Sequence, residues 1–362
     1  MQSKEGGSQR AAMSGEEVKA VLAQFRIPPL RTVHDFRRGS TRMAKALVEC
    51  VGGVRYLLKR RGATADDRAR LAYAHDVQRA LMGFRFPVPA LQTTSEGSSV
   101  FVGAGHLYEL FEFVEGERFR RTAGETRESG LLLARFHKTL RGWTPHAVPP
   151  DPGGYHASRT LAASWSRVWP AVHHADPTAH ESEVNRLVHA IRVRVDAAMV
   201  EASTVLEAEG RSGHKTVIHG DFHPGNLLFV AGSPIVMLDF DAVRPDQAII
   251  DVANGCLQYG MHPVGEKPVS EWTPSLNLVS VEGFIRGYAL SHALRLVGEE
   301  CQIVPALMVE AAIAESVPRI ALSGTFARRP GIEVLRFVDA KTRWIWEERA
   351  RLATLCMTCM KG

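Results

Sequence analysis

The sequence predicts an α+β fold in two parts, and two patterns lead to this prediction. After a short helix-like stretch at residues 16–25, short apolar runs typical of β-strands extend to about residue 115, apart from one inserted helical segment. From residue 116 onward, apolar residues recur at the spacing of amphipathic helices. We therefore expect an antiparallel sheet with one inserted helix over residues 15–115 and a mainly helical part over 116–362. Residues 1–14 are polar and are expected to form a mobile tail.

The predicted sheet rests on strand-like runs separated by glycine turns. Residues 45–51 and 54–59 flank Gly52-Gly53, a dipeptide typical of β-hairpins because glycine adopts positive φ angles without steric cost. Residues 99–103 and 107–114 flank a second glycine-containing turn. A weaker strand candidate covers residues 32–36, so residues 54–59 are the third predicted strand. The charged segment 65–82, with helical spacing, follows it.

In the second part, helical periodicity dominates. Only residues 216–219 and 234–239 form clear strands there. The expected helices cover residues 130–137, 181–209, 246–259, 279–297, 304–323 and 333–355.

Composition narrows the class of protein. Of 362 residues, 45% are hydrophobic and 23% are charged, which excludes fibrous and wholly disordered proteins. The 44 Lys and Arg against 39 Asp and Glu permit anionic partners without requiring them. Five cysteines are too few for a disulfide framework and indicate a reducing compartment, so we expect a cytoplasmic protein. No apolar run approaches the roughly 20 residues that span a bilayer, and we expect no membrane partner.

Polar residues crowd between the two strands of the second part, in His219-Gly-Asp-Phe-His-Pro-Gly-Asn226 and Leu238-Asp-Phe-Asp241. Asp221, Asn226 and Asp239 supply only hard oxygen ligands, the set that suits Mg²⁺. If Asn226 and Asp239 take the metal, Asp221 remains free to accept a proton from a substrate hydroxyl. The His-x₃-His spacing within this loop also fits zinc, but its glycines and proline disfavour the helix that zinc binding would need.

The pattern His-Gly-Asp-x-His-x-x-Asn, with Asp-Phe-Asp beginning thirteen residues after the Asn, resembles the aminoglycoside phosphotransferase superfamily, which includes choline kinases and type II homoserine kinases. The resemblance implies a protein-kinase-like fold of two lobes. It also implies ATP- and Mg²⁺-dependent transfer of the γ-phosphoryl group to a hydroxyl of a small molecule, such as a sugar, an amino alcohol, a homoserine-like compound or an antibiotic.

The resemblance assigns the central roles. Asp221 would be the catalytic aspartate, Asn226 and Asp239 would hold Mg²⁺, and Lys59 would contact the α- and β-phosphates of ATP. Further assignments are backbone contacts of Glu112 and Val114 with adenine, phosphate contacts of Gly39, Ser40 and Thr41, and supporting roles for His219, Asp241 and Asp251.

Three features depart from the protein-kinase pattern. The loop 37–42 has a single glycine, and Asp241 replaces the glycine of Asp-Phe-Gly. Where relatives often place a glutamate that pairs with the lysine, this chain reads Tyr73-Ala-His-Asp76, so Asp76 is the candidate partner of Lys59.

Structural interpretations compete with some of these roles. Lys59 taken alone is a solvated strand-end charge, and Asp251 is equally interpreted as a helix N-terminal acid or as a buried acid that braces the loop. Cys356-Met-Thr-Cys359 is interpreted as a neutral surface pair rather than a redox or metal site. Residues 31–71 carry eleven basic against four acidic side chains, but few aromatic residues lie among them, so a triphosphate is favoured over nucleic acid.

Two functions remain open at this stage. The first is a small-molecule kinase, and the basic side chains within residues 309–355 favour a neutral, zwitterionic or anionic acceptor over a polycationic one. The alternative is a non-catalytic, kinase-like nucleotide-binding or structural protein. Its only support is the missing glutamate partner of Lys59.

Overall fold

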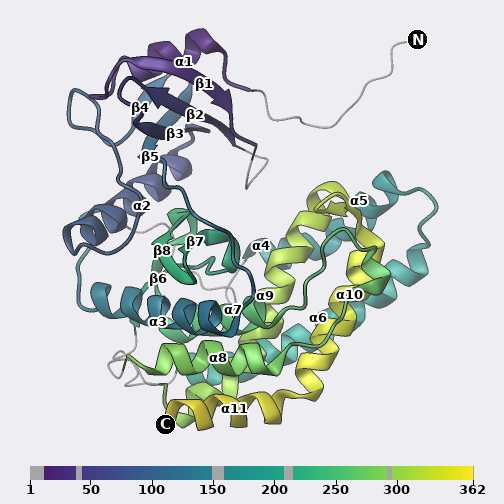
Figure 1. Cartoon of the computed structure of the whole chain (residues 1–362). Helices are drawn as coiled ribbons and strands as arrows, with labels where there is room; N and C mark the ends of the chain where they lie inside the picture. Colours follow the sequence, from purple (N-terminus) through teal and green to yellow (C-terminus); the bar gives the residue numbers. More distant parts are fainter. Residues whose placement is uncertain (1–11, 38–42, 149–158, 208–214, 292–295, 362) are drawn as a thin grey trace, which may run out of the picture. The chain divides into compact units, whose positions relative to one another are not determined.

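The computed structural model describes residues 12–37, 43–148, 159–207, 215–291 and 296–361 (Figure 1). They group into two compact units. The first comprises the described residues of 1–118, 144–150 and 235–242, and the second comprises those of 119–143, 151–234 and 243–362. Residues 239–241, which we assigned to the helical part, thus group with the first unit.

A five-stranded antiparallel sheet forms the first unit, with the order β1-β2-β3-β5-β4. This confirms the predicted sheet, and helix α2 (Ala65–Gly83) is the expected insertion after the third strand (Figure 1). The strands are β1 (Leu30–Asp35), β2 (Ala44–Cys50), β3 (Arg55–Arg61), β4 (Phe101–Gly103) and β5 (His106–Glu112).

Helix α1 (Gly15–Leu22) closes the hydrophobic core of this sheet. Ser14 begins the helix, because its side chain accepts a hydrogen bond from the backbone N–H of Glu17 at 3.0 Å. Val18 of α1 is fully buried in one cluster with Val48 of β2 and Leu58 of β3. Apolar burial therefore holds β3, the strand that carries Lys59, at the centre of the sheet.

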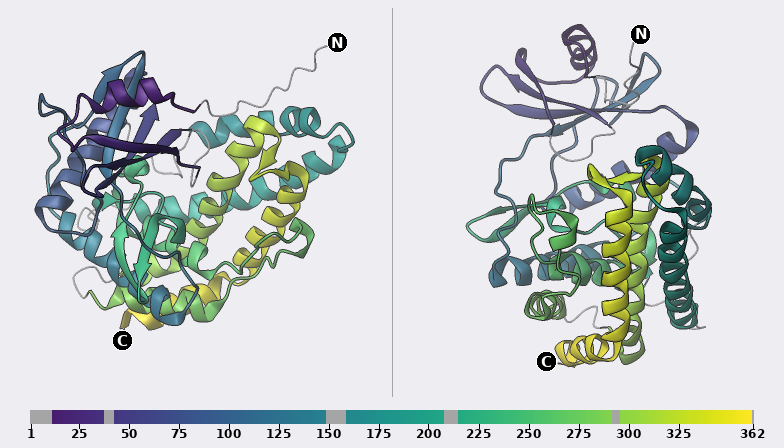
Figure 2. Two further views of the ribbon diagram at one scale, coloured as in Figure 1. Left: turned by 45° about the horizontal axis from the view of Figure 1, so that its top comes forward. Right: turned by 90° about the vertical axis from the view of Figure 1, so that its right-hand side faces the viewer.

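Helices make up most of the second unit (Figure 1). They are α3 (Ala123–Leu140), α4 (Arg159–Ser164), α5 (Val168–Ala175), α6 (Glu181–Leu206), α7 (Ala248–Gly260), α8 (Leu278–Ala289), α9 (Gly298–Ser323), α10 (Gly331–Glu347) and α11 (Arg349–Lys361). Helices α6, α9 and α10 run side by side (Figure 2). None of the helices in the described residues is long and apolar enough to cross a membrane.

The second part of the chain contains more short strands than the sequence predicted. Strand β6 (Lys215–Ile218) was expected, but its antiparallel partner β9 (Arg244–Gln247) was not, because Arg-Pro-Asp-Gln lacks an apolar alternation. Strands β7 (Leu227–Val230), β10 (Thr325–Phe326) and β11 (Arg329–Pro330) were also missed, and the unit boundary falls within β8 (Ser233–Met237).

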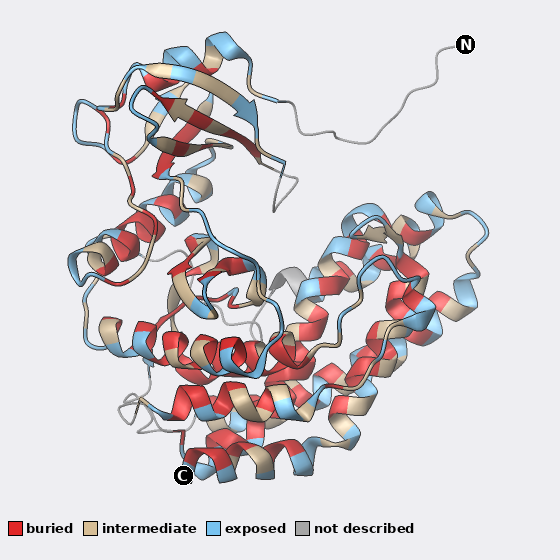
Figure 3. Cartoon of the chain, viewed as in Figure 1, coloured by how far each residue is buried: buried red, intermediate tan, exposed pale blue. Residues whose placement is uncertain are grey.

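Helices α3 and α8 approach each other at two glycines. A Cβ atom on Gly130 of α3 would lie 2.1 Å from the carbonyl oxygen of Phe284, and one on Gly287 of α8 would lie 2.0 Å from that of Arg127. Such distances exclude any side chain larger than hydrogen. Helix α7 is buried along most of its length (Figure 3), which explains its nearly continuous apolar sequence.

Candidate active site

Lys59 lies at the centre of a charged cluster in the first unit. Its Nζ is 3.8 Å from Oδ1 of Asp239 and 4.9 Å from the ring centroid of Phe111, so that an ion pair and a cation–π contact both hold the ammonium group. Only 12% of the Lys59 side chain is exposed. The structure therefore places Lys59 beside Asp239 rather than in open solvent.

Asp239 follows β8 in an unusual backbone conformation. Its φ angle of +63° lies in the left-handed region, which non-glycine residues adopt at a cost and which is frequent at functional sites. Among the described residues, no hydrogen-bond donor reaches its buried Oδ1. A buried carboxylate oxygen that lacks a donor fits the ligand set of a hard cation.

Asp241 anchors the same segment to β3. Arg61 donates two hydrogen bonds to its carboxylate, at 2.7 and 2.6 Å. Burial opposes ionisation of Asp241, but the charges of Lys59 and Arg61 outweigh it and hold the pKa well below its usual range. Arg61 thus fixes the chain immediately after Asp239.

The buried acid next to Lys59 in the sheet is Glu109 of β5, directly opposite Lys59 in the strand register. Glu109 accepts a hydrogen bond from Arg61, and its Oε2 is 2.7 Å from Nε2 of His75 on α2. Burial opposes its ionisation, but the charge of Arg61 and the hydrogen bond with His75 lower its pKa. We did not single out Glu109, although an acid within the apolar strand His-Leu-Tyr-Glu-Leu-Phe was a usable signal.

Asp76 does not take the place expected for it. Its Oδ2 accepts hydrogen bonds from the backbone N–H groups of His146 and Ala147, at 2.5 and 3.1 Å. The expectation that Asp76 replaces the glutamate partner of Lys59 is therefore wrong, because those two amides engage its carboxylate. The position before it in the chain, His75, faces the charged cluster instead, since adjacent helical residues point about 100° apart.

The loop with the predicted catalytic residue belongs to the second unit. Asp221 exposes 52% of its side chain, and its Oδ2 lies 3.7 Å from Nε2 of His223. The surrounding protein partly desolvates this carboxylate and so opposes its ionisation, but the interaction with His223 outweighs this and lowers the pKa of Asp221, which is therefore a carboxylate at neutral pH. Asn226 is buried, and its side-chain amide donates to the backbone oxygen of Asp221 at 2.9 Å. Asn226 therefore holds the turn that presents Asp221.

Asp251 braces this loop from the first turn of α7. Its carboxylate accepts hydrogen bonds from the backbone N–H groups of His219 and Gly220, at 2.6 and 2.9 Å, and lies 3.0 Å from Nε2 of His137. Both interpretations of Asp251 made from the sequence apply. Asp251 is an acid in the first turn of a helix, and it is also a 99% buried acid that braces the loop. Gly220 has a φ angle of +76°, which a glycine adopts without strain.

The described residues include both predicted adenine contacts. Glu112 is the last residue of β5, and Val114 follows this strand. The Glu112 backbone N–H donates to Ala90 at 2.8 Å, so this amide already has an acceptor. Gly39, Ser40 and Thr41 lie outside the described residues.

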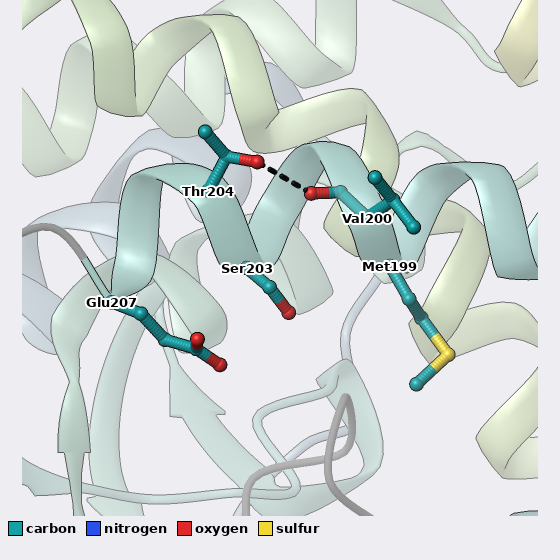
Figure 4. A pocket seen from close by; sticks show the side chains of 5 residues that line it. All are labelled: Met199, Val200, Ser203, Thr204 and Glu207. Carbon is teal, nitrogen blue, oxygen red and sulfur yellow. Dashed lines mark hydrogen bonds between the residues drawn. The ribbon is translucent and has the colours of Figure 1, made fainter.

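A hollow of about 490 Å³ on α6 is lined by Met199, Val200, Ser203, Thr204 and Glu207 (Figure 4). In it, Thr204 donates a hydrogen bond to the Val200 carbonyl. No residue predicted from the sequence to act in binding or catalysis lines this hollow, so it adds nothing to the candidate site.

A family model described as the phosphotransferase enzyme family matches residues 19–273, more than half of the chain. The chain belongs to the phosphotransferase enzyme family. The matched range includes Lys59 and the segment 219–241, and it confirms that the chain is an enzyme of the family that its motifs resemble. No curated protein matches the chain in sequence.

Solved structures share the fold of this phosphotransferase. The microcompartment-associated aminopropanol kinase has a TM-score of 0.67 at 15% identity, over 94% of this chain and 99% of that chain. Amicoumacin kinase, solved with AMP-PNP, Ca²⁺ and Ami, has a TM-score of 0.65 at 14% identity, over 93% of this chain and 94% of that chain. Choline kinase from Cryptosporidium parvum Iowa II has a TM-score of 0.63 at 14% identity, over 96% of this chain and 100% of that chain. These likenesses confirm the predicted protein-kinase-like fold.

Proposed function

We propose that this phosphotransferase transfers the γ-phosphoryl group of ATP, with Mg²⁺, to a hydroxyl group of a small molecule. The observation that carries the proposal is the ion pair between Lys59 and Asp239, because it joins the two residues expected to bind phosphate and metal. Amicoumacin kinase, with the same fold, was solved with a nucleotide analogue and a divalent cation, which supports the same class of cofactors here.

Each residue of the candidate site has a distinct role in the proposal. Lys59 binds the α- and β-phosphates as a fixed countercharge, and Asn226 and Asp239 hold the metal ion, which neutralises phosphate charge when bound. Asp221 orients the acceptor hydroxyl and accepts its proton, for which it must be ionised, as its lowered pKa ensures. Asp251 and His219 act only by positioning the loop.

On the nucleotide side, we assign the adenine contacts to the backbone carbonyl of Glu112 and the N–H of Val114. The Glu112 N–H already donates to the carbonyl of Ala90, so we assign the carbonyl of Glu112, and not its N–H, to this role. The segment 39–41 would contact phosphate through backbone N–H and hydroxyl groups. Arg61 and Glu109 keep β3 and β5 in register beneath this site.

The acceptor side favours a neutral, zwitterionic or anionic molecule. Arg319 of α9 is close enough to Asp221 for its charge to help lower the pKa of that carboxyl. One turn earlier on α9, Glu315 accepts a hydrogen bond from Gln258 at 2.9 Å. A face with both charges suits a zwitterion better than a polycation, since Arg319 repels ammonium groups near Asp221.

The test measures ADP release from Mg²⁺-ATP across a panel of sugars, amino alcohols, hydroxy amino acids and aminoglycosides. With any active acceptor, Asp221→Asn should lower kcat by about 10²–10⁴-fold and leave Mg²⁺-ATP binding unchanged. Asp196→Asn, an exposed substitution on α6, is the control. Unchanged turnover in Asp221→Asn would disprove the role of this residue, and binding of Mg²⁺-ATP without turnover on any acceptor would favour the non-catalytic alternative.

A further inference from the structure

Four of the five cysteines of the chain gather inside the second unit. Cys256 of α7, Cys301 of α9, and Cys356 and Cys359 of α11 are each at most 2% exposed. The sequence indicated a surface pair at 356 and 359, and this interpretation is wrong, because α11 packs against α8 and α9 and buries both thiols (Figure 1).

Cys356 pairs across helices rather than within its own motif. Its thiol donates a hydrogen bond to the sulfur of Cys301, with the two Sγ atoms 3.1 Å apart. A disulfide bond measures about 2.05 Å, so a movement of about 1 Å would bring these sulfur atoms to bonding distance. Cys301 stands near the start of α9, 55 positions from Cys356.

The hydrogen bond makes the two thiols chemically unequal. Donation from Cys356 lowers the pKa of Cys301, whereas the same hydrogen bond and burial raise that of Cys356. Because the thiolate is the nucleophile in thiol–disulfide exchange, we assign the first attack to Cys301.

We propose that Cys301 and Cys356 form a reversible disulfide that fastens the C-terminal helix α11 to the N-terminal end of α9. The oxidant is a low-molecular-weight disulfide such as oxidised glutathione. The Cys301 thiolate attacks one of its sulfurs and expels one thiolate. Cys356 then loses its proton, attacks the Cys301 sulfur and expels the second. Two protein thiols are oxidised by two electrons, and the external disulfide is reduced to two thiols.

The burial of both sulfur atoms limits the rate of this thiol–disulfide exchange. Cys301 is 1% exposed and Cys356 is fully buried, so the oxidant reaches them only when α11 separates locally from α9. We therefore expect slow oxidation of the folded protein, and slow reduction once the bond has formed.

A metal site explains the cluster less well. Among the described residues, no group of three or more His, Cys, Asp or Glu side chains is arranged to hold a metal ion. The contact between Cys301 and Cys356 is a pairwise one, as a disulfide requires. The disulfide joins α9 to α11 and does not depend on the identity of the acceptor.

The experiment equilibrates the full-length protein in buffers with graded ratios of reduced to oxidised glutathione, blocks the remaining thiols and maps the peptides by mass spectrometry. We expect one intramolecular disulfide that joins Cys301 to Cys356, and a Tm higher by about 5–10 °C in the oxidised protein. Cys301→Ser should abolish both effects, whereas Cys359→Ser, a substitution of the other buried cysteine of α11, should keep them.

Three results would overturn the proposal. A bond between Cys356 and Cys359 would show that the sequence motif, not the cross-helix contact, governs the pairing. Four reduced cysteines at every glutathione ratio would show that the pair does not oxidise. Stoichiometric zinc in the purified protein, lost in Cys301→Ser, would identify a metal site. Mapping of the unaltered protein decides the pairing even if the Cys301 variant fails to fold.

Discussion

The carboxylate of Asp251 accepts a hydrogen bond from the backbone N–H of His219 at 2.6 Å, and this bond fixes the start of the loop that bears Asp221. The second carboxylate oxygen binds the next amide along the chain, that of Gly220. A single buried side chain on α7 therefore determines the path of this loop. Its role is structural, but the position of the proposed catalytic carboxylate depends on it.

Removal of the Asp251 carboxylate should lower the stability of the protein. Asp251→Ala leaves two buried backbone N–H groups and His137 without their acceptor, and we expect a loss of about 3 kcal/mol or more in the free energy of unfolding. Asp251→Asn, which retains one acceptor oxygen, should cost less. Denaturant unfolding of both variants measures this, and equal losses would contradict the hydrogen-bonding role.

The same residue predicts a pH dependence. Burial opposes ionisation of Asp251, but its interactions with His137 and the loop backbone hold its pKa below the usual value of an aspartate. A depressed folded-state pKa gives stability that is fully present above the unfolded pKa and is lost as pH falls through the folded value. Unfolding measured from neutral pH to below about 4 should therefore show less acid sensitivity in Asp251→Asn than in the unaltered protein or in Asp196→Asn.

Asp239→Ala should weaken nucleotide binding, unlike Asp221→Asn. The substitution removes the proposed metal ligand and the counterion of Lys59 together. We expect the affinity for Mg²⁺-AMP-PNP, measured by calorimetry, to fall by about tenfold or more, and the affinity for AMP-PNP without Mg²⁺ to change less. Equal effects with and without the metal would argue against metal binding by Asp239.

The contact between α3 and α8 predicts opposite effects at two glycines of one helix. Gly287→Ala places a methyl group against the backbone of Arg127 and should cost about 3 kcal/mol or more in stability. Gly283→Ala meets only the Thr126 methyl group at 3.9 Å and should stabilise α8 by about 0.5–1 kcal/mol. Thermal unfolding compares them, and similar Tm values would show that the helices can separate without cost.

Lys341 of α10 is a buried cation that lowers stability at neutral pH. It is 3% exposed, its Nζ has no hydrogen-bond acceptor among the described residues, and burial lowers its pKa to about 8. The unfolded chain therefore binds more protons between about 8 and 10.5, and stability should rise with pH across that window. Lys341→Met should abolish this rise and stabilise the protein at neutral pH by about 1–3 kcal/mol.

Exposed Lys215 provides the control for that measurement, since Lys215→Met should leave the pH dependence unchanged. If the stability of Lys341→Met still rises with pH, the rise comes from another titratable group.

The sequence by itself predicted that the loop 219–226 carries the chemistry, and it determined whether strands or helices dominate each part of the fold. Alternating strands around Gly52-Gly53, helical periodicity after residue 116 and the spacing between Asn226 and Asp239 are local patterns, and local patterns can be read along the chain. The family match over residues 19–273 confirms the resemblance that those motifs carry.

Only the tertiary structure decided which side chains meet. Asp76 and His75 are neighbours in sequence, yet it is His75 that reaches Glu109, because the strand register and the orientation of α2 select it. Cys356 likewise pairs with Cys301, 55 positions away, rather than with Cys359 in its own motif. Such contacts depend on helix packing and strand register, which place residues that are distant in sequence next to each other and which no short segment of sequence contains.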